Sequence, residues 1–178
     1  MVQANDVVAF WREAGPARWF GGDAAFDAQC RERLLPPHLL AARRELDGWQ
    51  ATPEGALALL LLLDQIPRNV FRGSAHAFAT DPLARAFAAR AVAAGHDQAF
   101  EPALRAFFYL PFEHSEDPAD QARSLALFEA LGDANYLRYA RDHRDVIARF
   151  GRFPHRNAVL GRDTTADEQA WLDAGGGW

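Results

Sequence analysis

The spacing of hydrophobic residues predicts helices along almost the whole chain. Residues 7–13 form an apolar segment that could be a short strand or a helix, and the Phe-Trp pair within it favours the helix. Helical spacing resumes over residues 26–34. We expect Pro36 and Pro37 to end that helix, because proline lacks an N–H group, and a further helix to follow over residues 38–46.

The most apolar segment, residues 56–63, predicts a helix at the centre of the fold. Thr52, Pro53 and Glu54 precede it and supply a hydroxyl N-cap, a proline for the first turn and an acid near the positive end of the helix dipole. A helix that is apolar on every side packs against neighbours on several sides. Pro67 then interrupts or ends this helix.

The later helices are marked by the same kinds of signal. Asp-Pro pairs start two of them, and a capping box from Thr165 to Glu168 starts the last one. Short turns marked by proline and glycine join about eight or nine helices, which predicts antiparallel helical hairpins and an all-α fold. We expect one domain over residues 1–178, with residues 172–178 as a frayed tail.

Composition and charge exclude several classes of function. With 49% hydrophobic and 24% charged residues the chain has ordinary globular composition. All 19 basic residues are arginine, so P-loop and Schiff-base lysines are excluded. A net charge of −5 argues against a nucleic-acid partner bound through a broad basic surface.

No segment of the sequence resembles a membrane span or a signal peptide. The longest apolar run is far too short to cross a bilayer, and the N-terminus has no basic region before an apolar one. We therefore expect no membrane partner and a cytoplasmic location. The single cysteine, Cys30, falls in a helical pattern and is expected to be a small core residue rather than a nucleophile.

Polar residues concentrate in three stretches near predicted helix ends. Residues 64–72 read DQIPRNVFR, residues 107–117 read FFYLPFEHSED, and residues 143–157 read HRDVIARFGRFPHRN. Arginine forks beside imidazole and amide groups form a natural receptor for carboxylate or phosphate. The expected ligand-binding residues are Asp64, Gln65, Arg68, Asn69, Arg72, Ser115, Arg144, Arg152, His155, Arg156 and Asn157.

The residues of the same stretches could also form the active site of an enzyme. His114 or His143 could act as a general base and Glu116 as an acid, while an arginine holds developing negative charge. The aromatic residues before His114 could exclude water and shift the pKa of these groups. The ligand spacings typical of zinc, calcium and di-iron sites are absent, so we expect no metal and no cofactor.

Each stretch also has a structural explanation. Pro67 leaves the carbonyl of Leu63 without its usual donor, so nearby polar side chains could repair this helix end. Asn69 would then be a cap, and an arginine of the same stretch would pair with Asp64. In the third stretch the first histidine could be a hydrogen-bonded core residue, and the arginines could bind helix-end carbonyls and surface acids.

Together these stretches resemble an uncharacterised bacterial family called domain of unknown function 924. The likeness rests on the stretches at 64–72 and 107–117, on residues 143–162 and on the closing Thr-x-x-Glu segment, and it spans nearly the whole chain. It implies a tetratricopeptide-like fold of stacked helical hairpins in a right-handed superhelix. It implies no established activity, so no catalytic residue is carried over.

Our preferred interpretation is a binding module for an anionic small molecule or an acidic peptide. The three stretches hold more hydrogen-bond donors than acceptors in an otherwise acidic protein. The interpretation requires the stretches to share one pocket. The alternatives are a small-molecule enzyme that uses His/Glu acid-base chemistry in that pocket, and a protein-interaction scaffold in which the polar groups only order helix ends.

Overall fold

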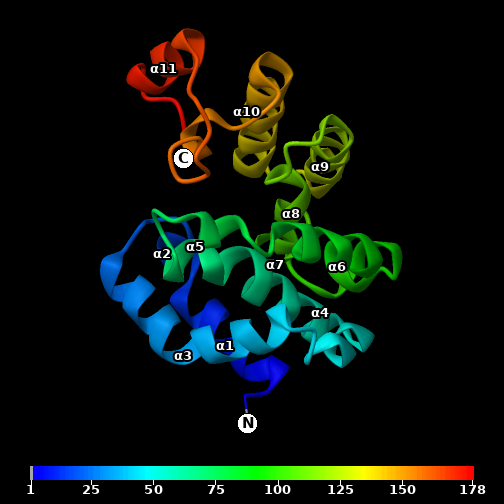
Figure 1. The fold of residues 1–178 in the computed structure, drawn as a ribbon. Helices are drawn as coiled ribbons and strands as arrows, with labels where there is room; N and C mark the ends of the chain where they lie inside the picture. Colours follow the sequence, from blue (N-terminus) through cyan, green and yellow to red (C-terminus); the bar gives the residue numbers. More distant parts are fainter. Residues whose placement is uncertain (1) are drawn as a thin grey trace. The chain divides into compact units, whose positions relative to one another are not determined.

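The computed structural model describes residues 2–178, which form helices joined by turns (Figure 1). No residue in this range lies in a strand, so the all-α prediction is confirmed. The α-helices are α1 (Ala4–Ala14), α2 (Pro16–Trp19), α3 (Ala24–Ala42), α4 (Pro53–Leu60), α5 (Ile66–Val70), α6 (Asp81–Ala93), α7 (Pro102–Arg105), α8 (Leu110–Glu113), α9 (Pro118–Leu131), α10 (Ala134–Phe150) and α11 (Ala166–Asp173). The 3-10 segments are η1 (Asp47–Ala51), η3 (Ala75–Phe78), η4 (His96–Ala99), η5 (Ala106–Phe108) and η6 (Pro154–Arg156), and η2 (Leu61–Gln65) is π-helical.

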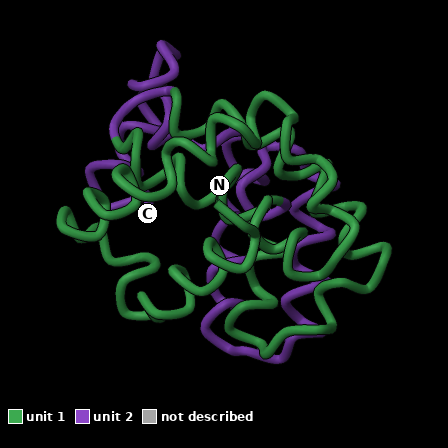
Figure 2. The backbone as a smooth tube through the Cα atoms, turned by 90° about the horizontal axis from the view of Figure 1, so that it is seen from below, with its two compact units in different colours: residues 1–72, 76–111 green, residues 73–75, 112–178 purple. Residues whose placement is uncertain are grey.

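The chain divides into two compact units (Figure 2). Unit 1 holds the residues up to Arg72 together with His76–Pro111, and unit 2 holds Gly73–Ala75 and Phe112–Trp178. The organisation of residues 1–178 as a single domain and the right-handed superhelix both stay predictions.

In unit 1, α4 is surrounded by other helices. The hydroxyl of Thr52 accepts a hydrogen bond from the amide of Gly55 at 3.1 Å, so the predicted N-cap is confirmed. Every residue from 56 to 63 exposes 1% of its surface or less. The helices α1 and α6 and the segment η1 pack against α4, which confirms the predicted central helix.

The helix α3 passes through both of its prolines, which corrects the prediction that Pro36 and Pro37 end it. Each proline removes one amide donor, but the carbonyl groups concerned belong to exposed residues one turn earlier, where water can replace the lost bond. Residues 38–42 of the helix predicted over residues 38–46 are therefore the last part of α3, and residues 43–46 form a turn. This continuation carries His38, whose Nδ1 lies 2.7 Å from the carbonyl oxygen of Leu62.

The central helix does not end at Pro67 but widens into η2 and continues as α5. In the widened turn the amide of Ile66 donates to the carbonyl of Leu61, five residues earlier. Pro67 has no amide hydrogen for the carbonyl of Leu63. The hydroxyl of Thr80 donates to that carbonyl at 2.5 Å. A polar side chain therefore satisfies this carbonyl, but it comes from outside the predicted stretch.

Unit 2 contains a helical hairpin made of α9 and α10, which pack against each other (Figure 1). Gly132 ends α9 with a φ of 77°, in the left-handed region that glycine tolerates best. The carboxylate of Asp133 then accepts hydrogen bonds from the amides of Asn135 and Tyr136 at 2.9 and 3.1 Å and starts α10. The glycine and N-cap pattern of the sequence predicts this hairpin.

The last helix, α11, begins at the predicted capping box. The hydroxyl of Thr165 accepts a hydrogen bond from the amide of Glu168 at 3.3 Å, and the carboxylate of Glu168 accepts one from the amide of Thr165 at 2.8 Å. The sequence predicts a frayed tail over residues 172–178. In the structure, by contrast, the ring of Trp178 stacks on that of His143, with ring centroids 3.6 Å apart.

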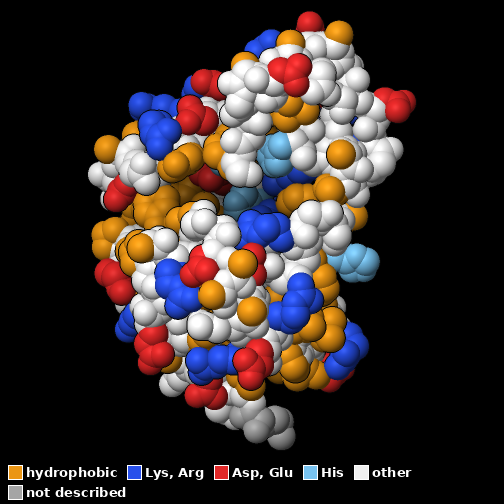
Figure 3. Space-filling model, turned by 90° about the vertical axis from the view of Figure 1, so that its left-hand side faces the viewer, with side chains coloured by type: hydrophobic (Ala, Val, Ile, Leu, Met, Phe, Trp, Pro, Cys, Tyr) orange, Lys and Arg blue, Asp and Glu red, His pale blue; other side chains and the backbone are white. Residues whose placement is uncertain are grey.

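The surface carries charges of both signs. On the face in Figure 3, arginine side chains lie among acidic side chains and do not form one broad basic patch. Within residues 2–178 no helix combines the length and the apolar character that crossing a bilayer would need.

Candidate functional site

The first polar stretch, residues 64–72, lies in unit 1, and Arg68 in it is bound by carboxylates. Its guanidinium donates to the two carboxylate oxygens of Asp81 at 2.8 and 2.9 Å and lies 3.3 Å from a carboxylate oxygen of Asp64. The side chain of Gln65 donates to Asp64 at 2.6 Å. The predicted pairing of an arginine with Asp64 is confirmed, and this buried network ties η2 to the start of α6.

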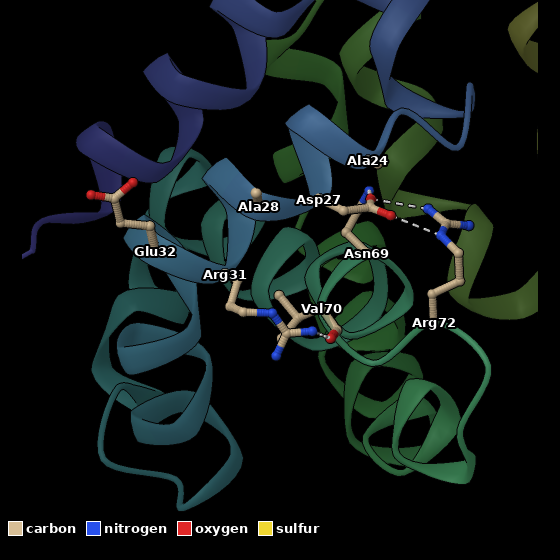
Figure 4. A pocket seen from close by; sticks show the side chains of 8 residues that line it. All are labelled: Ala24, Asp27, Ala28, Arg31, Glu32, Asn69, Val70 and Arg72. Atoms are coloured by element: carbon tan, nitrogen blue, oxygen red, sulfur yellow. Dashed lines mark hydrogen bonds and ion pairs between the residues drawn. The ribbon is translucent and has the colours of Figure 1, made fainter.

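The second half of this stretch is bound to α3 through Asp27. The side-chain amide of Asn69 donates to Asp27 at 2.7 Å, and Arg72 donates to it at 2.9 and 3.0 Å (Figure 4). The prediction that Asn69 caps a helix is therefore wrong, because its donor reaches across to α3. Burial raises the pKa of Asp27, but the bonds from Arg72 and Asn69 lower it more, so the pKa lies below its ordinary value and the carboxyl is ionised at neutral pH.

These residues line a groove of about 450 Å³, which we call the α3–α5 groove. Its lining residues are Ala24, Asp27, Ala28, Arg31, Glu32, Asn69, Val70 and Arg72. One Nη of Arg31 donates to the carbonyl of Val70 at the end of α5. Arg31 forms no ion pair with any residue in the range 2–178.

The sequence analysis named only Asn69 and Arg72 among the groove residues, and Asp27 and Arg31 are the most important of those it missed. Ala24, Asp27, Ala28 and Arg31 are spaced by three or four residues, which places them on one face of α3. A face that packs against another helix is usually apolar, whereas this one carries an acid, a base and two alanines. This is the composition of an ordinary solvent-facing helix face, so no pattern in the sequence singles out Asp27 and Arg31.

In unit 2, residues 114–116 of the second polar stretch meet the third stretch. The carboxylate of Glu116 accepts a hydrogen bond from the amide of Phe153 at 2.8 Å, and Arg156 donates to the carbonyl of His114 at 3.0 Å. The rings of His114 and His143 have centroids 6.2 Å apart. The end of the second stretch thus shares one region of unit 2 with the third stretch, whereas residues 107–111 belong to unit 1. The single pocket for all three stretches stays a prediction.

Glu116 is held in an ion pair with Arg162, a residue outside the predicted stretches. The guanidinium donates to the two carboxylate oxygens at 2.8 and 3.1 Å. Burial raises the pKa of Glu116, but Arg162 and the amide of Phe153 lower it more, so the pKa lies below its ordinary value. A general acid must hold its proton at the working pH. This geometry does not favour the acid role that the sequence suggests for Glu116.

Two arginines of the third stretch, Arg144 and Arg152, also bind acids. Arg152 donates to both oxygens of Glu168 at 2.6 and 2.8 Å, and Asn157 donates to Glu168 at 3.3 Å. The hydrogen bond from Arg152 and the amide at the start of α11 lower the pKa of Glu168 to about 2. Arg144 bonds to its neighbour Asp145 at 2.6 Å on the surface. These pairs follow the structural explanation for this stretch.

His143 is buried and neutral at neutral pH. Its Nδ1 lies 2.8 Å from the carbonyl of Tyr139 and 3.5 Å from a carboxylate oxygen of Glu113. Both neighbours are acceptors, so Nδ1 carries the hydrogen and Nε2 keeps its lone pair. Burial, with a smaller contribution from the nearby His114, holds the pKa of His143 well below 6.5. The expectation of a hydrogen-bonded core histidine is confirmed.

The two remaining predicted residues lie beside these groups. The hydroxyl of Ser115 donates to Asp120 at 2.7 Å and accepts from the amide of Asp117 at 3.2 Å, so it supports the start of α9. The ring of His155 lies 5.3 Å from that of Trp178, centroid to centroid. Among residues 2–178, no group of three or more histidine, cysteine or acidic residues is placed to hold a metal ion.

Comparison with known proteins gives a family and a fold. The model of a family described as bacterial protein of unknown function (DUF924) matches residues 7–176. The chain belongs to this family. It is also similar to a solved structure of a protein of unknown function from Agrobacterium tumefaciens, with 56% sequence identity and a TM-score of 0.94 over 96% of this chain and 97% of that one.

These matches confirm the resemblance that the sequence motifs indicate. A comparison with curated proteins gave no match. The candidate sites of this DUF924 protein therefore have to be inferred from its structure. They are the α3–α5 groove of unit 1 and the region of unit 2 around His114, His143 and His155.

Proposed function

We propose that this DUF924 protein binds a small anionic molecule in the α3–α5 groove, with Arg31 as the main anchor. The main support for the proposal is that Arg31 lines the groove and forms no ion pair within residues 2–178. The groove volume of about 450 Å³ lies in the range of small-molecule sites. A small molecule therefore suits the groove better than an acidic peptide.

Arg31 is held in place by a backbone carbonyl, and its charge acts on Asp27 at longer range, where it helps to lower the pKa of that carboxyl. A guanidinium has five N–H donors in a rigid plane, and the hydrogen bond to the carbonyl of Val70 uses one Nη of Arg31. This bond orients the plane, and the donors that remain match the two oxygens of a carboxylate or phosphate. Arg31 thus has the geometry of a pre-oriented anion receptor.

The neighbouring residues reinforce this charge. Arg72 binds Asp27 through Nε and Nη2, so Nη1 of Arg72 is not used in that pair. Figure 4 shows Arg31 and Arg72 on the two sides of Val70, while the carboxylate of Glu32 points away from them. Two guanidinium groups against the single carboxylate of Asp27 leave this part of the groove positive.

The proposal assigns different roles to the residues of the original prediction. Asn69 and Arg72 line the α3–α5 groove and belong to the site. Arg68, Arg144 and Arg152 bind acidic side chains of the protein itself, so we assign them to the fold. The ligand class stays the one that the sequence suggests, an anionic small molecule.

Substitution of Arg31 by glutamine tests the proposal. We would screen carboxylates and phosphates by thermal shift and measure the affinity of the best ligand by calorimetry. Loss of a charge-assisted hydrogen bond costs about 1.5–3 kcal/mol, so R31Q should bind this ligand roughly 10- to 100-fold more weakly than the wild type. R31K should recover part of the affinity, because it keeps the charge but not the planar fork.

Arg33 supplies the matched control. It lies on the same helix, its guanidinium covers the ring of Phe10 with 4.6 Å between the group and the ring centroid, and it does not line the groove. R33Q should therefore bind like the wild type. Equal weakening in R31Q and R33Q, or no stabilisation of the wild type by any anion in the screen, would contradict the proposal.

A further inference from the structure

A second site lies in unit 2, where four aromatic rings surround the ring of Trp178. The ring of His143 stacks on it with centroids 3.6 Å apart and planes 11° apart. His155 and Phe153 approach it edge-on with centroids at 5.3 and 5.8 Å, and Trp171 lies at 6.4 Å. We call His143, Phe153, His155 and Trp171 the aromatic box.

The geometry of the aromatic box suits any planar ring of similar size. Aromatic rings attract one another in stacked and edge-to-face arrangements, and the box presents one flat imidazole face together with the edges of other rings. Interplanar angles of 85° for His155 and 86° for Phe153 fit this edge-to-face pattern. These contacts depend on ring shape and not on the covalent link between Trp178 and the chain.

Glycines bring Trp178 to the box. A Cβ atom on Gly176 would lie 2.3 Å from the ring of Trp171, and one on Gly177 would lie 3.1 Å from the Cβ of His155. Gly177 also has a φ of 112°, which side chains rarely adopt. The backbone can therefore pass this closely over the box only because residues 176 and 177 are glycine.

Trp178 fills its site incompletely. Its side chain belongs to a residue that is 49% exposed, and a run of three glycines gives the segment many alternative conformations when it leaves the box. A groove of about 340 Å³ adjoins the ring. It is lined by Asp142, Asp145, Val146, Arg149, Phe150, Trp171, Gly177 and Trp178.

We propose that the aromatic box binds a planar ligand of indole size and that Trp178 occupies the box when this ligand is absent. The inference goes beyond the anion site and does not depend on it, since the two sites lie in different units. The side chain of Trp178 then competes with the ligand for the aromatic box. The apparent affinity for the ligand is then the intrinsic affinity multiplied by the fraction of molecules in which the box is open.

The experiment compares indole binding to the wild type and to two variants of the full chain. W178A removes the competing ring, and G176A displaces it, because the added Cβ meets the ring of Trp171. Both variants should bind indole about 10-fold more tightly than the wild type, if Trp178 holds the box closed in most molecules. Binding would be followed by the NMR signals of the imidazole protons of His143 and His155.

Two controls separate this effect from a general change in the protein. W178F keeps an aromatic ring and should bind indole as weakly as the wild type. G48A adds a methyl group where no atom lies within 4 Å and should change nothing. If W178A is folded by circular dichroism and binds indole no more tightly than the wild type, or if indole leaves the signals of His143 unchanged, the proposal is wrong.

Discussion

The arginines of this protein differ in what they bind. Arg68 and Arg152 each donate to a carboxylate on another segment of the same unit, at distances of 2.6–2.9 Å. Arg31 donates to a backbone carbonyl and forms no ion pair within residues 2–178. A guanidinium that forms an ion pair with a carboxylate of the protein stabilises the fold, whereas one with unused N–H donors can bind a ligand.

The pair formed by Arg152 and Glu168 makes stability depend on pH in the acid range. The folded pKa of Glu168 is about 2 and its ordinary value is 4.5. Because the folded pKa is the lower one, the stabilisation is fully present above the ordinary value and is lost as the pH falls towards 2. Glu168→Gln removes this contribution, so between about pH 5 and pH 2 the free energy of unfolding should fall less in E168Q than in the wild type.

Urea unfolding at a series of pH values measures this difference. The exposed neighbour Asp167 gives the matched control, and D167N should keep the pH dependence of the wild type. Identical pH dependence in E168Q and the wild type would show that the pair with Arg152 contributes nothing to the folded state.

At the scale of helices, the effect of a proline depends on the carbonyl group four residues earlier, which loses its N–H donor. What matters is whether this carbonyl is buried or exposed to water. Pro36 and Pro37 sit in α3 without ending it, since the carbonyls concerned belong to exposed residues. Pro67 follows the buried helix, where water cannot replace the missing donor. There the chain forms a π-helical turn, and Thr80 donates to the carbonyl of Leu63.

Removal of this donor should destabilise unit 1. Thr80→Val keeps the size of the side chain but leaves the carbonyl of Leu63 buried without a donor, which costs about 1–3 kcal/mol of the free energy of unfolding. Thr80→Ser keeps the hydroxyl and should stay much closer to the wild type. Chemical denaturation of the three proteins measures the difference, and equal stability of T80V and T80S would show that the hydroxyl does not satisfy Leu63.

At the scale of the whole molecule, the sequence predicts what depends on neighbouring residues and misses what depends on distant ones. The N-cap of Thr52 and the start of α11 at Thr165 follow from local patterns, and both are confirmed. The partner of an arginine is set by tertiary structure. Glu116 and Arg162, for example, are separated by 46 positions in the sequence, and nothing local connects them.

The candidate site shows the same limit. Asn69 and Arg72 belong to a polar stretch that stands out in the sequence, whereas Arg31 is one of several arginines on a long helix. Arg31 becomes notable only when α3 packs against α5 and the carbonyl of Val70 orients it. The ligand class could be suggested from the donor-rich polar stretches, but the anchor residue could be found only from the packing of α3 against α5.

The most direct test of the account is a crystal structure of the protein with the anion that stabilises it most in the thermal-shift screen. The account predicts that the anion lies in the α3–α5 groove and accepts two hydrogen bonds from the guanidinium of Arg31, with Asn69 and Arg72 beside it. An anion bound at another surface while the α3–α5 groove stays empty would contradict it.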